Sequence, residues 1–149
     1  MEFRVIHKDE MIIVGKKITI SFADDYISQV KELWTQFQND YGKSIQNVID
    51  DKPIVLYFEQ GLAGQGKLSY LLGLHVSKEN DHTLETIHLP KSDYACFSIK
   101  GQSMSDIIEA WNIIMKLQVE QDTGIALEIY HLDHELESKR TLECLVSIV

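Results

Sequence analysis

The chain has 149 residues, of which 44% are hydrophobic and 25% charged, and its 23 acidic against 14 basic residues give a formal net charge of −9. This length is sufficient for one well-packed domain, and such an acidic chain repels phosphate groups. We therefore expect a single domain over residues 1–149 that makes no direct contact with nucleic acid or membrane and suits cationic partners.

Two cysteines, Cys96 and Cys144, lie inside apolar strand patterns without Cys-x-x-Cys spacing, so neither a disulfide framework nor a thiolate metal site is predicted. The charged N-terminal stretch MEFRVIHKDE lacks the apolar run of a signal peptide, and no segment is apolar for long enough to span a bilayer. These patterns predict a cytoplasmic protein with reduced core cysteines.

The first half of the chain is predicted to form strands around one helix. In chain order these are an extended segment over residues 3–20 with a bend at 9–10, a helix to about residue 39, a hairpin of antiparallel strands over 54–59 and 67–76, and a polar connection over 77–83. Ser21 with Asp24 three residues later is a helix-start signal, and Gly42 is expected to help stop that helix.

The second half repeats this order. Its predicted elements are a strand over residues 94–100 led in by 87–90, a helix over 103–115, a break at 123–124, a strand over 125–132, a charged loop over 134–141 and a closing strand over 142–149. Ser103 and Asp106 have capping-box-like spacing at the start of the helix, and Gly101 ends the strand before it.

A constant offset of 77 residues relates the two helices and the strands before them. It pairs Ile27, Val30 and Trp34 with Met104, Ile107 and Trp111. The pattern predicts an α+β fold of two β-α-β-β units, approximately residues 1–80 and 88–149, with a pseudo-two-fold axis, antiparallel sheets and two main helices around a central cleft. A groove between two similar units is a preferred place for a small-molecule site.

Several short segments resemble the gyrase-inhibitor-like effector-binding domains found at the C-termini of AraC-type and MerR-type multidrug regulators. The segments are YACFSIKG at 94–101, Ala110-Trp111, LEIY at 127–130 and ECLVSI at 143–148. Leu33-Trp34-x-x-Phe37 and Tyr70–Gly73 are similar to the stand-alone branch of that family, the integron-cassette effector-binding proteins, in which no DNA-binding domain is attached. The resemblance spans nearly the whole chain and implies the same duplicated fold.

The resemblance also implies a cleft between the halves that binds lipophilic, often cationic compounds through aromatic rings and a buried glutamate. It places Glu128 at the position of the ligand-facing glutamate, and strand alternation puts Tyr130 on the same face. The predicted ligand-binding residues are Glu128, Tyr130, Glu143, Tyr57, Tyr70 and Trp34. The alternatives are a solvated strand face or a loop-side position for the glutamates, and ordinary core packing for the aromatic residues.

Two motifs suggest other chemistry but lack part of what that chemistry needs. Residues 61–67 have the glycine and lysine spacing of a phosphate-binding loop, but Leu68 stands where Ser or Thr would hold magnesium, and a strand pattern follows. Residues 131–135 contain metal-ligand types at a spacing that fits a strand end and loop. We predict no nucleotide, no metal and no cofactor.

We therefore expect a small-molecule binding protein, linked to transcriptional regulation or sensing through an unidentified protein partner, because no DNA-binding module is recognised. Some relatives of this fold resemble hydrolases that open strained, cyclopropane-bearing toxins, and this is the alternative. Paired Glu128 and Glu143 would permit such a reaction, but their separation is not fixed by the sequence, so no catalytic residue is assigned.

Overall fold

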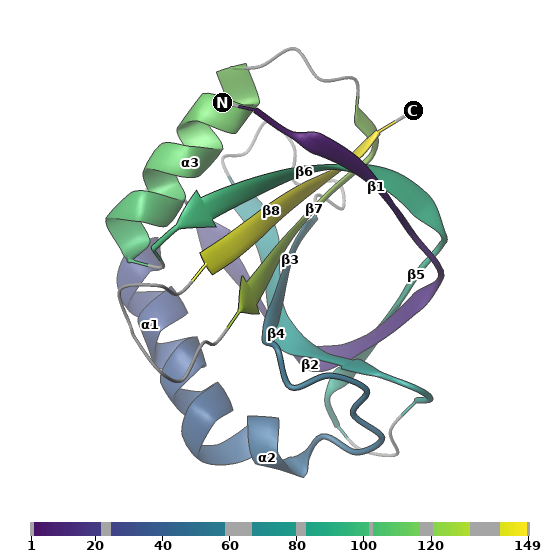
Figure 1. Cartoon of the computed structure of the whole chain (residues 1–149). Coiled ribbons are helices and arrows are strands. Elements are labelled where there is room, and N and C mark those ends of the chain that lie inside the picture. The colour runs from purple at the N-terminus through teal and green to yellow at the C-terminus, as the bar shows by residue number, and fades with distance from the viewer. Residues whose placement is uncertain are drawn as a thin grey trace.

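In the computed structural model, one antiparallel sheet of eight strands forms the framework, and the helices lie on one of its faces (Figure 1). The structure describes residues 2–21, 25–58, 67–79, 83–101, 103–116, 121–131 and 141–148. The strands are β1 Arg4–Lys8, β2 Met11–Ser21, β3 Ile54–Phe58, β4 Lys67–Val76, β5 Glu85–Leu89, β6 Ser92–Lys100, β7 Gln121–His131 and β8 Thr141–Ile148. The helical segments are α1 Tyr26–Gln36, a π-helical turn Phe37–Tyr41, α2 Gly42–Ser44 and α3 Met104–Lys116.

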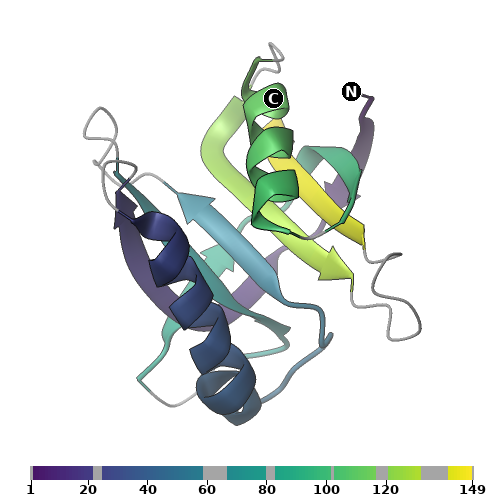
Figure 2. The ribbon, with the colours of Figure 1, turned by 90° about the vertical axis from the view of Figure 1, so that its left-hand side faces the viewer.

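The strand order shows the internal duplication directly. The sheet runs β1-β6-β8-β7-β3-β4-β2-β5. Outward from the junction of the two halves, the second half has the order β7-β8-β6, and the first half has the corresponding order β3-β4-β2. Each half carries one long helix, α1 beside the first and α3 beside the second (Figure 2). The halves join where β3 pairs with β7, with Val55 opposite Glu128. The predicted α+β fold of two β-α-β-β units is confirmed.

The two faces of the sheet bury separate apolar cores, because neighbouring side chains of a strand point to opposite sides. The helix-facing core contains Val55, Leu72, Phe97 and Val146 from the strands and Val30, Leu33, Ile107 and Ile114 from the helices. The other core contains Ile13, Leu56, Leu71, Leu127 and Leu145. The sheet curls around this second core (Figure 1), which is how strands alone can cover it.

The first helix begins and ends differently from the prediction. Asp25 caps α1, because its carboxylate accepts a hydrogen bond of 3.2 Å from the Ser28 backbone, whereas Ser21 is the last residue of β2 and Asp24 lies outside the described residues. Gly42 does not stop the helix, since helical backbone continues to Ser44. Burial of Tyr41, whose hydroxyl donates to the Leu72 carbonyl at 2.9 Å, holds this extra turn against β4.

Two strand predictions also need correction, and a third agrees with the structure. The bend predicted at 9–10 separates β1 from β2, and β1 pairs with β6 of the other half whereas β2 pairs with β4 and β5. The lead-in at 87–90 belongs to β5, an edge strand in its own right. The predicted break at 123–124 falls within β7, where the register with β8 shifts between Gln121 and Ala126. The bounds and partners of these strands depend on pairing across the sheet, and the local sequence does not encode that pairing.

Other predictions are confirmed or lie outside the described residues. Ser103 caps α3, its hydroxyl accepting from the Asp106 backbone at 3.2 Å, and both cysteines are free and buried. The loops at 61–66 and 134–140 lie outside the described residues, but β4 does follow the first of them. Within the part of the chain that the structure describes, no helix is long and apolar enough to cross a membrane.

Candidate ligand-binding site

Glu128 lies in the middle of β7, at the junction of the two halves. Its register partners are Val55 of β3 and Cys144 of β8. Its side chain points to the helix-bearing face, because its neighbours Leu127 and Ile129 belong to the opposite core. The residue is 0% exposed. A carboxylate in this position is removed from water completely and depends on protein groups to stabilise its charge.

Three aromatic residues donate hydrogen bonds to the Glu128 carboxylate. The Tyr57 hydroxyl donates to Oε2 at 2.7 Å, the Trp111 indole Nε1 donates to the same oxygen at 2.6 Å, and the Tyr130 hydroxyl donates to Oε1 at 2.5 Å. Burial raises the pKa of Glu128, and the three hydrogen bonds oppose that shift without cancelling it. Burial therefore still disfavours the ionised form of Glu128, even with three hydrogen bonds to its carboxylate.

Five aromatic side chains, which we call the aromatic cage, surround this carboxylate. They are Trp34 of α1, Tyr57 of β3, Tyr70 of β4, Trp111 of α3 and Tyr130 of β7. Ring centroids lie 5.7 Å apart for Tyr57 and Trp111, 5.2 Å for Tyr57 and Tyr70, and 4.7 Å for Trp34 and Tyr130, all edge to face. The Trp34 indole donates to the Tyr70 hydroxyl at 3.0 Å. These contacts form a chain from Trp111 through Tyr57, Tyr70 and Trp34 to Tyr130, and both ends of the chain are hydrogen-bonded to Glu128.

The tyrosines of the cage remain hydrogen-bond donors at all ordinary pH values. Burial is the main cause that raises the pKa of Tyr57, Tyr70 and Tyr130 well above the usual value, and the charge of Glu128 is the next. Tyr70 and Tyr130 are buried, whereas Trp34, Tyr57 and Trp111 are half-buried. The last three rings are the part of the cage that solvent reaches, and we call them its outer wall.

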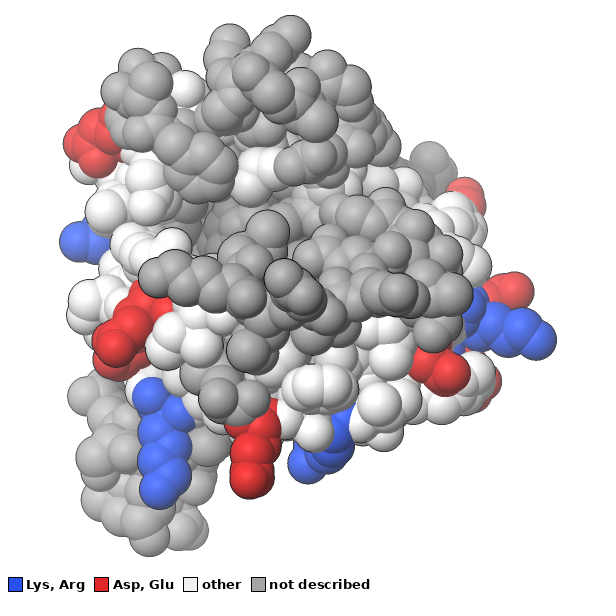
Figure 3. Space-filling model, turned by 90° about the horizontal axis from the view of Figure 1, so that it is seen from above, with Lys and Arg blue, Asp and Glu red and all other residues white. Residues whose placement is uncertain are grey.

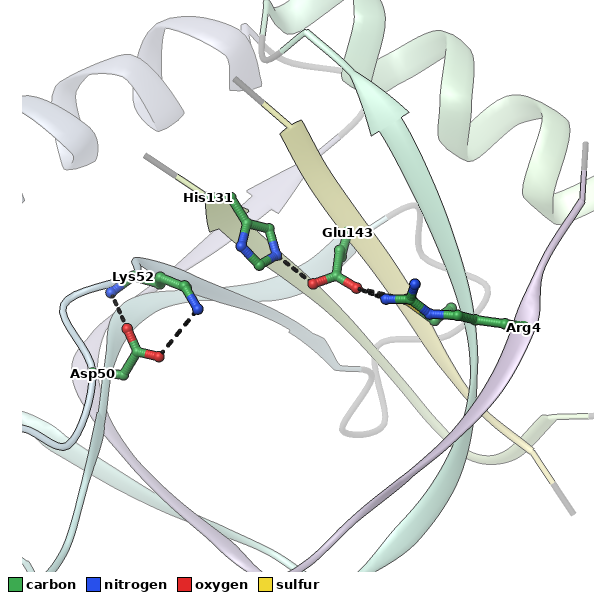
Figure 4. Close-up of polar contacts among 6 residues, drawn as sticks. Arg4, Asp50, Lys52, His131 and Glu143 are labelled. Atoms are coloured by element: carbon green, nitrogen blue, oxygen red, sulfur yellow. Dashed lines mark hydrogen bonds and ion pairs between the residues drawn. The ribbon is translucent and has the colours of Figure 1, made fainter. Parts of the chain in front are cut away.

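The structure brings five of the six predicted residues together and leaves Glu143 apart. Cys144 is the register partner of Glu128, so Glu143, one residue before it, points to the opposite face of the sheet. There Glu143 accepts hydrogen bonds from Arg4 at 2.7 Å and from the Cys96 thiol at 3.0 Å, and it is hydrogen-bonded to His131 (Figure 4). The sheet thus separates the two carboxylates that a hydrolytic pair would require.

Glu143 also has the opposite electrostatic character. Its partial burial would raise its pKa, but the hydrogen bonds from Cys96 and His131 and the positive charges of His131 and Arg4 together lower it. The charge of Glu143 is therefore already balanced within the protein. Through Arg4 and His131, the Glu143 side chain links β8 to the edge strand β1 and to β7 (Figure 4).

Trp111 is the cage residue that was not among the predicted ligand-binding residues. The 77-residue offset between the halves pairs it with Trp34, and that signal could have identified it. Its indole N–H reaches Glu128 across the helix–sheet interface, whereas Trp34 reaches Tyr70. The two tryptophans thus occupy related helix positions but contact different polar partners.

A metal site and a surface hollow are the other candidates considered in the described parts of the chain. No three His, Cys, Asp or Glu residues in these parts are arranged to hold a metal ion. A surface hollow of about 310 Å³ lies between β2 and α1, lined by Lys16, Ile18, Thr19, Gln29, Glu32, Leu33 and Gln36. It includes no cage residue and no deeply buried charge, so the aromatic cage is the stronger candidate.

Comparison with known proteins gives matches over nearly the whole chain. The model of a family described as integron-associated effector binding protein matches residues 4–143. The fold is similar to that of SAV2435 bound to tetraphenylphosphonium, with a TM-score of 0.79, 18% identity, and 100% of this chain and 94% of that chain covered.

Two further solved structures are similar. One is a candidate bacterial transcription regulation protein from Staphylococcus aureus MU50, with a TM-score of 0.75, 18% identity and coverages of 99% and 98%. The other is an integron cassette protein from the mobile metagenome of Vibrio cholerae, with a TM-score of 0.73, 13% identity and coverages of 99% and 95%. No curated protein matches the sequence. At these identities the structural matches show a shared fold.

Proposed function

Because the chain belongs to the family of integron-associated effector-binding proteins, we propose that its aromatic cage binds a lipophilic cation with Glu128 as the counter-charge. The observation that carries this proposal is a glutamate with 0% exposure inside a shell of five aromatic side chains. A positive charge on the ligand would stabilise the buried carboxylate, and the ring faces would attract the same charge through their quadrupoles.

The electrostatic balance of Glu128 supports a cationic ligand over a neutral one. Three strong donors do not cancel the cost of burying the carboxylate, because its pKa remains raised. A bound cation would lower that cost, and a neutral ligand would not. The related fold of SAV2435 is bound to tetraphenylphosphonium, a lipophilic cation, and this supports the same ligand class here.

The outer wall of the cage suggests how such a ligand enters. Trp34 and Trp111 are half-buried and come from the separate helices α1 and α3. A ligand that reaches Glu128 must part these rings and that of Tyr57. Binding should therefore change the surroundings of both tryptophans. Since both tryptophans of the chain belong to the cage, its tryptophan fluorescence reports on the cage alone.

We further propose that the chain acts as a single effector-binding domain that senses or sequesters its ligand and signals through a separate protein. The similarity to a candidate transcription regulation protein supports a regulatory setting. The alternative of a hydrolase is not favoured by any observation, because Glu128 and Glu143 lie on opposite faces of the sheet.

The test is a titration of the protein with tetraphenylphosphonium followed by tryptophan fluorescence and by calorimetry. We expect saturable binding that is weakened in Glu128→Gln by about 1 to 3 kcal/mol, the usual range for a hydrogen-bonded charge. Affinity for triphenylmethanol, a neutral compound of similar shape, should change little in that variant. Glu109→Gln removes an exposed charge from α3 and is the matched control.

Two results would contradict the proposal. One is the absence of a saturable fluorescence change with tetraphenylphosphonium in the folded wild-type protein. The other is equal weakening of the cationic and the neutral compound by Glu128→Gln, because that would indicate a loss of shape and not of charge. Glu109→Gln should bind both compounds as the wild type does.

A further inference from the structure

One polar hydrogen atom in the cage has no acceptor among the described residues. Tyr57, Tyr130 and Trp111 donate to Glu128, and Trp34 donates to the hydroxyl oxygen of Tyr70. A tyrosine hydroxyl is both a donor and an acceptor. The Tyr70 oxygen accepts from Trp34, but within the described part of the chain its own O–H donates to no protein group.

Such a donor is unusual at this degree of burial. Tyr70 is 2% exposed, and a buried donor without an acceptor costs about 1 to 3 kcal/mol. Tyr41 lies on the same face of the sheet, and its buried hydroxyl does donate, to the Leu72 carbonyl at 2.9 Å. The fold can therefore provide an acceptor for the hydroxyl of a buried tyrosine on this face, and it provides none for the hydroxyl of Tyr70 among the described residues.

The Tyr70 hydroxyl belongs to the interior of the cage. Its ring packs against Tyr57, and its oxygen meets the indole of Trp34, whose ring packs against Tyr130. Tyr57 is the link between this hydroxyl and the carboxylate, because its ring packs against Tyr70 and its own hydroxyl donates to Glu128. The charge of Glu128 also contributes to raising the Tyr70 pKa. A ligand that contacts Glu128 and Tyr57 would therefore come close to the unused donor of Tyr70.

We propose that Tyr70 donates a hydrogen bond to an acceptor atom of the ligand, so that the cage prefers lipophilic cations carrying a carbonyl or similar oxygen over purely hydrocarbon ones. The inference rests on the proposed function and specifies the ligand class of the same site. A small number of placed polar groups commonly sets ligand orientation in apolar pockets, and sites that donate hydrogen bonds discriminate against ligands that lack the acceptor. Tetraphenylphosphonium has no acceptor and cannot use Tyr70.

The test compares two cations of the same charge and nearly the same shape. (4-Acetylphenyl)triphenylphosphonium carries a carbonyl, and (4-isopropenylphenyl)triphenylphosphonium has a CH₂ group in place of that oxygen. Calorimetry on the wild-type protein should give about three- to tenfold tighter binding of the acetyl compound, the range expected for one hydrogen bond. In Tyr70→Phe the two affinities should become equal, through weaker binding of the acetyl compound.

The control is Tyr41→Phe, which makes the same change to another buried tyrosine that is not part of the cage. It should keep the wild-type ratio of affinities, even if it lowers stability. Tyr70→Phe also frees the Trp34 indole N–H, so the ratio is measured as well in the double variant Trp34→Phe/Tyr70→Phe, in which neither donor remains. Far-UV circular dichroism checks that each variant is folded.

The outcomes separate this inference from the proposed function. Equal wild-type affinities for the two cations, both weakened by Glu128→Gln, would overturn the role of Tyr70 and leave the cation site standing. A preference for the acetyl compound that persists in Trp34→Phe/Tyr70→Phe would also overturn it, because a group other than these two would then donate. Absence of binding by either cation would overturn the cation site and this inference with it.

Discussion

At the residue scale, two glutamates close in the sheet show how local surroundings set the behaviour of one chemical group. Glu128 is fully buried and its pKa is raised by that burial, although three donors contact it. Glu143 lies on the other face and its pKa is lowered, because Cys96, His131 and Arg4 outweigh the effect of burial. The folded environment thus disfavours the ionised form of Glu128 and favours the ionised form of Glu143.

The raised pKa of Glu128 predicts a dependence of stability and affinity on pH. As pH rises above about 4.5, the ordinary value, the folded protein keeps a proton that the unfolded chain has lost, so the free energy of unfolding falls relative to Glu128→Gln. Within this window the difference changes by up to about 1.4 kcal/mol per pH unit. Affinity for tetraphenylphosphonium should rise over the same window, because the cation favours the ionised form. Urea denaturation and calorimetry from pH 4.5 to 8 measure both.

Glu143→Gln is the control, with the opposite sign. Because the Glu143 pKa is lowered, its contribution to stability is present above pH 4.5 and is lost as pH falls through its lower folded value. This variant should therefore be less stable than the wild type at neutral pH and approach it in acid. Its pH profile for tetraphenylphosphonium should match the wild type. A Glu128→Gln protein with the wild-type pH profile would show that another group titrates.

At the element scale, β2 and β4 approach each other closely where Gly15 and Gly73 are paired. A Cβ atom at Gly73 would lie 2.1 Å from the Val14 carbonyl oxygen, and one at Gly15 would lie 2.3 Å from that of Leu72. Both neighbours are backbone atoms of paired strands, which cannot yield as a flexible side chain does. Glycine at these two positions therefore allows β2 and β4 to approach this closely, and β4 is the strand that carries Tyr70.

Gly73→Ala is expected to destabilise the protein by about 3 kcal/mol, because the strands must separate to admit the methyl group. Displacement of β4 should also disturb Tyr70, three residues away, and weaken tetraphenylphosphonium binding. Urea denaturation measures the first effect and calorimetry the second. Ser69→Ala, at a buried position of the same strand, adds no atoms and should cost less than about 1 kcal/mol. An unchanged denaturation midpoint in Gly73→Ala would show that the backbone relaxes freely.

At the scale of the whole molecule, the cage exists only because the two halves form one sheet. Tyr57 and Tyr70 come from the first half and Trp111 and Tyr130 from the second, and β3 pairs directly with β7. On the side that Figure 3 shows from above, the described acidic and basic side chains are interspersed around the outline of the molecule.

A shared sheet predicts that the halves unfold together. Trp34→Phe leaves Trp111 as a fluorescence probe in the second half, and Trp111→Phe leaves Trp34 in the first. In each variant the denaturation midpoint from fluorescence should coincide with that from far-UV circular dichroism, as expected for a single cooperative unit. Two separate transitions in either variant would contradict the prediction of one domain.

The sequence by itself determined the repeating features of the protein. Alternation along the strands and helical spacing around Trp34 and Trp111 repeat at an offset of 77 residues, and they predicted the duplicated α+β fold. Alternation also placed Glu128 and Tyr130 on one face, which the hydrogen bond between them confirms. These features depend on local periodicity, and the pattern of residues encodes local periodicity directly.

Only the tertiary structure decided which side chains meet. Glu128 and Glu143 were both candidates for the site, and the register of β7 with β8 placed them on opposite faces. Pairing between strands distant in the sequence carried Arg4 to Glu143. Packing of α3 against the sheet brought Trp111 to Glu128, although the sequence marked it only as the counterpart of Trp34. Register and packing arise from contacts between distant segments, so local periodicity does not specify them.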